Sequence, residues 1–360
     1  MDERIFKHEE KAIFSLRSLY RKYGYLPYKM SKFEEYEYYI RNKDFLISDR
    51  IITFNDTNGK LLALKPDVTL SIVKNGEDHP GCKQKVYYNE NIYRISETTG
   101  QYKEIMQAGV ECIGDIGMYD IFEVLSLAAQ SLALISEDYI LQISHLGILS
   151  AVLNDACTDR NFTQKAIRYI SGKNVHDLSR LCAEYSVSAD KAQMLTAFTQ
   201  TYGKRDLVIA KLEALCGDSA DAALLELKTL SALLDTLPHP ERIVFDFSVV
   251  NNMSYYNGIV FTGFLKGISD GVLAGGQYDK LMQKLQRNSG AIGFAVYLDL
   301  LEQLSVTSAA YDVDVLLLYS ENTDPELVCE NVQRLIAEGK TVSAQKSIPC
   351  KLRYKTVLEI

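Results

Sequence analysis

The sequence predicts an α+β fold, a mostly antiparallel sheet with flanking helices and a helical insertion. Strand-like segments joined by short turns occur on both sides of a stretch, at about 160–236, in which strand signals vanish. In that stretch Leu, Ala, Lys and Glu recur at helical spacing. The hydrophobic content (47%) and charged content (24%) are those of a globular protein with a sizeable core.

Two periodicities alternate along the chain before the helical stretch. Apolar residues three or four apart predict helices, and alternating apolar residues predict strands. The predicted elements are a helix over 8–23 closed by Gly24, strand-like segments from 44 to 74 with a hairpin turn at Asn58 and Gly59, paired strands at 85–95 and 101–114, a helix over 119–136, a strand over 138–145 and a short helix over 146–156.

Strand signals return after the helical stretch. They predict strands at 242–250, 255–265 and 271–276, a helix over 278–287, the segment GAIGFAVY, a helix over 298–304 and, in the tail from 311, a strand, a helix over 325–338 and a short strand at 340–344. The chain ends before a doubly wound domain would be complete. We therefore expect a core (1–159 and 237–309), a helical insertion (160–236) and a truncated C-terminal α/β segment (310–360).

Composition argues against several classes of protein. The formal net charge of −8 gives no general attraction to nucleic acid, and no run of Lys and Arg gives a local one. The seven cysteines are scattered, without a CxxC pair or a nearby His cluster, so neither a disulfide framework nor a metal site is expected. The charged N-terminus is unlike a signal peptide, and no stretch of 18 apolar residues exists. We expect a cytoplasmic protein without a membrane partner.

The stretch LALKPDVT (62–69) places two polar residues at a strand end. Asp67 could hold an ammonium group there, with the Thr69 hydroxyl as a second contact. A proline turn with an Asx-type hydrogen bond is the alternative, and for this stretch alone it is the more common one.

The hairpin NIYRISETTGQYKEIMQAGVECIG (91–114) carries polar residues on a face that the pattern predicts to be partly buried. Gln107, Gly109 and Glu111 share that face because side chains alternate along a strand. Arg94 lies near the end of the preceding strand. Buried Gln and Glu need partners, which a bound cation or imidazole would supply, or, more commonly, an internal Arg or Lys.

Two later stretches combine tyrosines with tight backbone. NNMSYYNGIVF (251–261) contains Tyr255 and Tyr256, and AGGQYDKL (274–281) places Tyr278 after a Gly-Gly pair. Such groups suit a flat ligand that the backbone approaches closely, although each stretch alone is also typical of a strand with a tight bend.

Together, the order and spacing of these motifs resemble the class II aminoacyl-tRNA synthetase core, and specifically the histidyl-tRNA synthetase family, over roughly residues 8–310. The family's F-R, loop and G-R-Y-R-E-F-x-Q-x-G-V-E appear as YRISETTGQYKEIMQAGVE, its L-R-P-E-G-T as LKPDVT and its G-G-R-Y-D as GGQYD. The resemblance implies a class II synthetase-like fold and a histidine pocket formed by Asp67, Thr69, Gln107, Glu111, Tyr255, Tyr256 and Tyr278.

The positions that the family uses for catalysis differ here. Its R-G-L-D-Y-Y appears as NNMSYY, which puts Asn251 in place of the activating Arg. Its motif G-F-A-x-G-x-E-R appears as GFAVYLDL, which puts Leu300 in place of the ATP-binding Arg, and its motif-2 loop Arg is Gln101. Arg94 is kept as a candidate anion contact. Adenylation needs cations aimed at a phosphate, and each lost charge costs about 10²–10³ in rate. Synthetase activity is therefore not expected, unless Arg287 or Arg353 reaches the site.

These departures resemble the regulatory subunits of ATP phosphoribosyltransferase, a family of synthetase-like proteins. The resemblance implies a non-catalytic chain, with no cofactor and no tRNA, that assembles with a short-form catalytic ATP phosphoribosyltransferase subunit in histidine biosynthesis and takes L-histidine as effector. It also implies a homodimer within a hetero-oligomer. A divergent synthetase or stand-alone histidine-activating paralogue, and a scaffold whose pocket has drifted, are the alternatives.

The tetrapeptide KMSK at 29–32 matches the ATP signature of class I synthetases. That class also needs an HxGH motif and a dinucleotide-type fold, and neither is predicted here. On the class II resemblance the stretch falls on motif 1, with Ser31 in place of a Pro and Glu34 kept. Lys29 and Lys32 are therefore expected on a dimer-interface segment rather than at an ATP phosphate.

Overall fold

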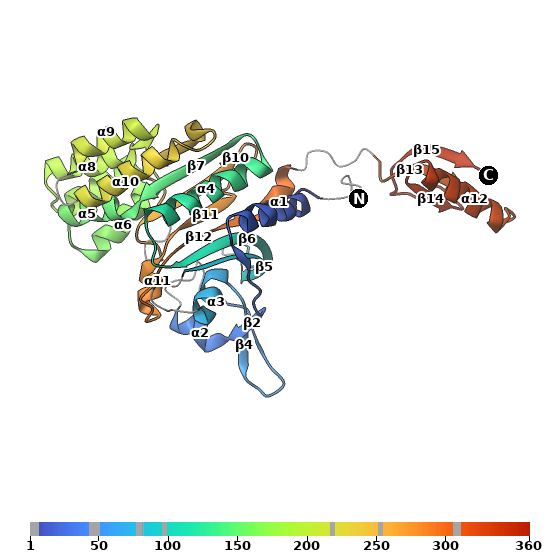
Figure 1. Ribbon diagram of the computed structural model, residues 1–360, viewed down its shortest axis with the longest axis horizontal. Helices are drawn as coiled ribbons and strands as arrows, with labels where there is room; N and C mark the ends of the chain where they lie inside the picture. Colours follow the sequence, from blue (N-terminus) through green and yellow to red (C-terminus); the bar gives the residue numbers. More distant parts are fainter. Residues whose placement is uncertain are drawn as a thin grey trace. The chain divides into compact units, whose positions relative to one another are not determined.

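A broad sheet organises the first of two units, Met1–Leu304 and Ser305–Ile360, in the computed structural model (Figure 1). The structure describes residues 7–42, 51–76, 81, 83–95, 99–216, 220–250, 255–304 and 311–360. Within them the sheet has nine strands, in the spatial order β1 (Leu26–Pro27), β5 (Gln84–Ile95), β6 (Tyr102–Gly114), β12 (Gly290–Tyr297), β11 (Leu273–Gln277), β10 (Ile259–Leu265), β7 (Tyr139–His145), β9 (Ile243–Asp246) and β8 (Tyr202–Gly203). These neighbours pair antiparallel except for β1–β5 and β7–β9.

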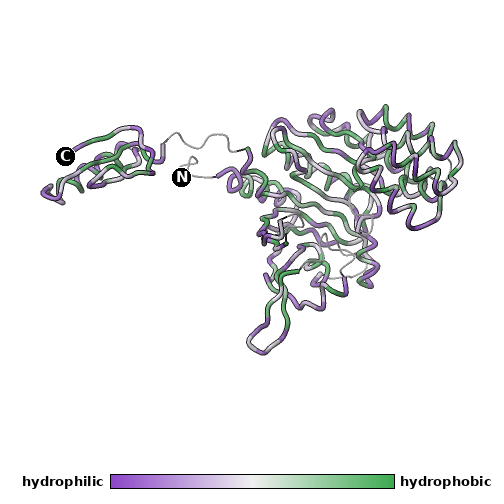
Figure 2. The backbone as a smooth tube through the Cα atoms, turned by 180° about the vertical axis from the view of Figure 1, so that it is seen from behind, coloured by the Kyte–Doolittle hydropathy of each residue, from purple (hydrophilic) through white to green (hydrophobic). Residues whose placement is uncertain are grey.

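The helices α1 (His8–Lys22) and α4 (Met118–Ile135) cover one face of this sheet (Figure 1). Strand β6 shows how the sequence builds that face, because Ala108, Val110 and Cys112 alternate into the core shared with the helices. The 3₁₀-helix η5 (Leu298–Leu304) packs beside α1. Figure 2 shows hydrophobic residues concentrated along the strands beneath these helices.

Helix α4 is long and apolar enough to cross a membrane, but 61% of it is buried inside the fold. Two of its residues carry charge and are also buried: Asp120 pairs with Lys83 (2.7 Å) and Glu123 with Lys85 (2.5 Å), at the start of β5. These ion pairs and the packing against the sheet identify α4 as a core helix.

A smaller layer covers the opposite face near β5 and β6. It contains the helices α2 (Tyr36–Arg41), α3 (Val68–Asn75) and α11 (Asp279–Lys284) and the antiparallel strands β2 (Phe33–Glu35), β4 (Leu61–Leu64) and β3 (Thr53–Asn55). Its apolar cluster includes Leu70 of α3 and Leu281 of α11 together with Tyr88 of β5. The alternation along β5 therefore serves two cores, because Tyr87 faces the α1 side.

A helical bundle lies at the β7–β9–β8 end of the sheet (Figure 1). Its described helices are α5 (Leu146–Ala156), α6 (Arg160–Ser171), α7 (Val175–Glu184), α8 (Ala189–Thr199), α9 (Arg205–Leu215) and α10 (Asp221–Leu234). Helix α10 packs on α4 and α5 packs on β10, so the bundle shares its core with the sheet. A 3₁₀ turn, η4 (Pro240–Arg242), leads back into β9.

The second unit is a small parallel sheet with one described helix. Strand β13 (Val313–Leu318) lies between β14 (Val342–Gln345) and β15 (Tyr354–Glu359), and α12 (Pro325–Ala337) connects β13 to β14. Asp324 caps α12 by accepting a hydrogen bond from the Glu326 amide (3.0 Å). The predicted strand, helix and strand of the tail are confirmed, and the parallel pairing is that of a βαβ unit.

The predicted strand-like segment from 44 to 74 is partly wrong. Residues 44–50 lie outside the described part of the chain, and the hairpin turn at Asn58 and Gly59 joins β3 to β4 as expected. Residues 68–75, however, form helix α3. Their β-branched composition is typical of a strand, but Asp67 caps the first turn and Val68, Leu70 and Ile72 become buried, so tertiary packing overrides local preference.

Other elements also differ from the prediction. Strand β8 interrupts the predicted helical stretch, residues 298–304 form a 3₁₀-helix, and β15 was not predicted because most of its residues are exposed and show no alternation. Strand β9 ends four residues early, since the Asp246 carboxylate accepts hydrogen bonds from the Ser248 amide (2.9 Å) and hydroxyl (2.6 Å) and forms a turn. Strand β10 begins at Ile259 rather than at Tyr255.

Candidate functional site

A cavity of about 430 Å³ opens on the face of the sheet opposite α1 and α4. Strands β5, β6, β12 and β11 contribute its floor. Residues at the starts of α3 and α11 and the tyrosines before β10 contribute its walls. The antiparallel pairing of these strands therefore decides which side chains meet.

Small residues form the middle of the floor, and larger polar residues stand at its ends. The opposed residues of β6 and β12 are Gly109 and Ala295 in the middle, Glu111 and Gly293 at one end, and Gln107 and Tyr297 at the other. Ala274 of β11 continues the middle row beside Ala295. Because a strand rises about 3.3 Å per residue, the backbone positions of Glu111 and Gln107 are about 13 Å apart.

The Glu111 carboxylate is the acidic end of this row and is 2% exposed. It accepts hydrogen bonds from the Thr69 hydroxyl (2.7 Å) and from the Tyr278 hydroxyl (2.5 Å). Burial raises the pKa of Glu111 to about 8, against the opposing effect of these two hydroxyls. Among the described residues, its hydrogen-bond partners are these two neutral hydroxyls rather than the internal Arg or Lys that is the commoner expectation.

Gly293 makes room for this carboxylate. A Cβ atom at Gly293 would lie 1.8 Å from the Glu111 carboxylate and 2.5 Å from the backbone carbonyl of Val110. No side chain fits there, so the glycine of β12 and the glutamate of β6 depend on each other.

Asp67 and Arg94 form a second charged region of the cavity wall. Oδ1 of Asp67 accepts a hydrogen bond from the Leu70 amide (2.9 Å) and caps α3, while Oδ2 lies 4.0 Å from Nη2 of Arg94. Nε of Arg94 donates to the Pro66 carbonyl (3.0 Å). Burial raises the pKa of Asp67, against the effects of the Leu70 amide and Arg94. The Asx-type hydrogen bond expected as the alternative for LKPDVT is therefore present, and Asp67 also lines the cavity.

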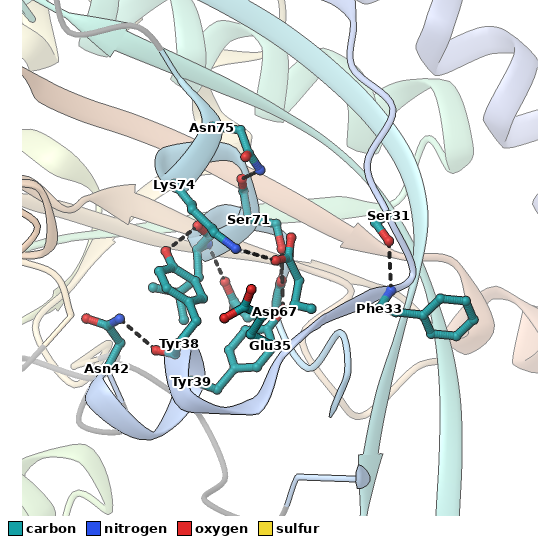
Figure 3. A network of polar contacts seen from close by, with 12 residues as sticks. Ser31, Phe33, Glu35, Tyr38, Tyr39, Asn42, Asp67, Ser71, Lys74 and Asn75 are labelled. Atoms are coloured by element: carbon teal, nitrogen blue, oxygen red, sulfur yellow. Dashed lines mark hydrogen bonds and ion pairs between the residues drawn. The ribbon is translucent and has the colours of Figure 1, made fainter. Parts of the chain in front are cut away.

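Helix α2 holds α3, and with it this part of the wall, in place (Figure 3). The Tyr38 hydroxyl donates to a backbone carbonyl of α3 (2.7 Å), and the Tyr39 hydroxyl lies 3.4 Å from Ser71 Oγ. Lys74 pairs with Glu34 of β2 (2.6 Å) and lies over the Tyr38 ring. The segment that resembles motif 1 thus supports the cavity from behind.

Tyrosines enclose the cavity on the side of β10 and α11. The rings of Tyr255 and Tyr256 are 4.7 Å apart, and those of Tyr255 and Tyr278 are 5.7 Å apart. Burial raises the pKa of all three hydroxyls well above 10, so they stay protonated and can donate. The wall is therefore aromatic and carries neutral hydrogen-bond donors.

Gln107 offers an amide to the cavity. Its side chain is 4% exposed and makes no hydrogen bond to any residue in the described ranges. Because the amide faces the cavity, its NH₂ can donate to a polar ligand and its oxygen can accept from one.

All eight residues that the sequence singled out line this one cavity, namely Asp67, Thr69, Arg94, Gln107, Glu111, Tyr255, Tyr256 and Tyr278. Sequence reasoning missed Tyr88, Phe294 and Tyr297, together with the small residues of the floor. The alternation in GFAVY puts residues 293, 295 and 297 on one face, but only the pairing of β12 with β6 places that face in the cavity.

The positions of the family's catalytic arginines do not bring cations to the cavity. Asn251 lies outside the described residues. Leu300 packs against the apolar core, and Gln101 is exposed. Arg287 does not reach in either, because its guanidinium donates to the carbonyls of Val73 (3.0 Å) and Gly76 (2.7 Å) at the end of α3.

Other basic residues of interest lie elsewhere. Arg353 belongs to the second unit, where it pairs with Asp312 (2.7 Å). Lys29 and Lys32 are exposed and do not line the cavity. Of the described residues that line it, Arg94 is the one cation. Within the described ranges, no group of three or more His, Cys, Asp or Glu is placed to hold a metal ion.

Comparison with known proteins agrees with this geometry. The family model described as Histidyl-tRNA synthetase matches residues 1–301. The chain belongs to the histidyl-tRNA synthetase family. A similar protein from Oceanobacillus iheyensis, named ATP phosphoribosyltransferase regulatory subunit, is 29% identical over 298 residues, covering 82% of this chain and 73% of the relative.

Solved structures of the histidyl-tRNA synthetase fold match as well. An ATP phosphoribosyltransferase regulatory subunit/histidyl-tRNA synthetase from Bacillus halodurans aligns with a TM-score of 0.77 and 24% identity over 98% of this chain and 93% of that one. A chain of the ATP phosphoribosyltransferase complex from Thermotoga maritima aligns with a TM-score of 0.64 and 19% identity over 81% of this chain and 97% of that one. The class II synthetase-like fold and both resemblances drawn from the sequence are confirmed.

The variant Glu111→Gln tests whether the buried Glu111 carboxyl is protonated, through the pH dependence of the free energy of unfolding. The ordinary pKa of the group is 4.5, and in the folded protein it is raised to about 8. Between these values the folded state keeps a proton that the unfolded state has lost, so this carboxyl lowers stability as pH rises, by up to about 1.4 kcal/mol per pH unit. The amide does not titrate. The variant should therefore gain stability relative to the wild type from about pH 5 to pH 8, measured by urea denaturation. A difference that stays constant with pH would contradict the buried, protonated carboxyl.

Proposed function

We propose that this chain is a non-catalytic regulatory subunit that assembles with a catalytic ATP phosphoribosyltransferase subunit, supports its activity and mediates feedback inhibition by L-histidine. The observation that carries the proposal is the composition of the cavity. Its polar groups suit an amino acid with an imidazole ring, whereas Arg94 is the one cation among its described lining residues.

The chemistry of histidine matches the two ends of the cavity. An imidazole ring has one nitrogen that donates and one that accepts, and Glu111 with the Tyr278 hydroxyl offers both kinds of partner. At the other end, Asp67 and Gln107 suit an ammonium group and Arg94 suits a carboxylate. The aromatic wall of Tyr255 and its neighbours favours a flat ring between the ends.

The same composition disfavours adenylation. Transfer of an AMP group needs fixed cations around the α-phosphate, and such groups are typically worth about 10²–10³ in rate each. The described residues supply one cation, and Leu300 places an apolar side chain in the core where the family has an arginine. A divergent histidyl-tRNA synthetase is therefore the second candidate, favoured by the match of residues 1–301 to the histidyl-tRNA synthetase family model.

Relatives support the choice of partner. The Oceanobacillus iheyensis relative is named as a regulatory subunit of ATP phosphoribosyltransferase, and the Thermotoga maritima structure is a complex of that enzyme. We carry this assembly over to the present chain, and we expect a homodimer within the hetero-oligomer. Histidine would inhibit by binding one arrangement of the complex more tightly than another, since an effector shifts an equilibrium only through such a difference.

The direct test is co-purification with a short-form ATP phosphoribosyltransferase, followed by assay of its activity with and without L-histidine. We expect a stable complex, activity that depends on this chain, and inhibition by histidine. Glu111→Ala should keep the complex and its activity but lose the inhibition. Failure of the two chains to associate would remove the proposed partner.

Histidine should also stabilise this chain alone. A ligand that binds only the folded state raises its stability by about 2.7 kcal/mol at a concentration one hundred times Kd. We expect L-histidine to raise Tm, and we expect Glu111→Ala and Tyr278→Phe to reduce the increase. Tyr102→Phe, on an exposed tyrosine of β6 outside the cavity, is the control and should keep it. The absence of any effect, alone and in the complex, would favour a scaffold whose pocket has drifted.

Pyrophosphate exchange separates the regulatory subunit from a synthetase. We expect no histidine-dependent exchange of pyrophosphate into ATP, because Arg94 is the one cation among the described residues that line the cavity and adenylation needs several. A histidyl-tRNA synthetase of known activity, assayed in parallel, provides the positive control. Robust exchange by this chain would overturn the regulatory proposal.

A further inference from the structure

Tyr297 is a cavity residue that neither the sequence motifs nor the proposed histidine contacts use. It ends strand β12 and lies directly opposite Gln107 of β6. Side chains of opposed residues in an antiparallel pair share a face and stand about 4.5–5.5 Å apart at Cβ. Tyr297 therefore stands at the Gln107 end of the floor, in the same cavity as Asp67 and Arg94.

The hydroxyl of Tyr297 is available to a ligand. It makes no hydrogen bond to any residue among those that the structure describes, although the side chain is partly buried. Burial raises the pKa of this hydroxyl, Arg94 acts in the opposite direction, and Asp67 raises it further. The phenol therefore stays protonated and can donate, and it lines the same cavity as both charged residues.

Tyr297 also departs from the sequence motif of the histidyl-tRNA synthetase family. In GFAVYLDL it occupies the place of the second glycine of G-F-A-x-G-x-E-R. An aromatic ring with a polar tip therefore fills a place that the motif leaves without a side chain. This change adds one neutral donor at the end of the cavity where Arg94 is the one described cation.

We propose that Tyr297 is a specificity-determining residue whose hydroxyl donates a hydrogen bond to the carboxylate of the bound amino acid, beside Arg94. The inference rests on the proposed function, since it assigns one further contact to the same histidine. It predicts that the cavity prefers an amino acid with a free carboxylate to the amine that lacks it.

The charges of the wall favour this orientation. An amino acid carries its ammonium and its carboxylate on one carbon atom, and Asp67 and Arg94 present opposite charges 4.0 Å apart. The Arg94 guanidinium already pairs with Asp67 and donates a hydrogen bond to the Pro66 carbonyl. A second donor for the carboxylate is therefore useful, and a hydrogen bond to a charged group is worth about 1.5–3 kcal/mol.

The test compares L-histidine with histamine, which has the imidazole and the amine but no carboxylate. Calorimetric Kd values are measured for the wild type, Tyr297→Phe and Tyr278→Phe. We expect Tyr297→Phe to weaken histidine binding by roughly ten- to a hundredfold and to leave histamine binding within about twofold. Tyr278→Phe, which removes a hydroxyl from the imidazole end, should weaken both ligands by a similar factor.

The outcomes separate the role of Tyr297 from the proposed binding of histidine. Equal losses for the two ligands in Tyr297→Phe, or no loss for either, would overturn the role of Tyr297 while leaving histidine binding intact. If the wild type binds neither ligand, the proposed function fails and this inference fails with it. Should Tyr297→Phe not fold, histidine and histidinol are compared on the wild type, and equal affinities would overturn the proposal.

Discussion

The hydrogen-bonded carboxylate of Glu111 is the constraint on which the site depends. It ties three parts of the chain together, because Thr69 brings the start of α3 to β6 and Tyr278 brings the start of α11. Strand β12 is a fourth segment that depends on this carboxylate, since any side chain at Gly293 would collide with it. A buried acid without such partners would cost several kcal/mol, so strand register, helix placement and cavity shape are fixed jointly.

The residues that line the cavity and the positions of the family's catalytic arginines are different parts of this chain. The polar groups that face the cavity are acids, an amide, hydroxyls and the guanidinium of Arg94, which are groups that can recognise a small polar molecule. The cations that would act on a phosphate belong to other positions. Leu300 packs into the apolar core, and Arg287 is engaged with backbone carbonyls. Neither Leu300 nor Arg287 lines the cavity, although Arg287 holds the far end of α3.

Sequence patterns predicted most of the sheet and the eight motif residues of the cavity, because alternation along β6 and the spacing of the motifs are local signals. They failed at α3, where a strand-like composition becomes helical through the Asp67 cap and burial. They also failed for Tyr88 and Tyr297, which reach the cavity only through pairing with Gly109 and Gln107 across neighbouring strands. Such register-dependent contacts join residues far apart in the chain, and no short pattern records them.

The row of small residues along the floor has a consequence of its own. Between Glu111 and Gln107 the floor residues of β6, β12 and β11 are Gly109, Ala295 and Ala274, and Tyr88 of β5 lies opposite Gly109. A Cβ atom at Gly109 would lie 2.6 Å from the Tyr88 hydroxyl and 2.1 Å from the Phe294 carbonyl. The free depth of the cavity above its middle therefore depends on Gly109 remaining a glycine, while the fixed spacing of a β-strand keeps the end groups apart.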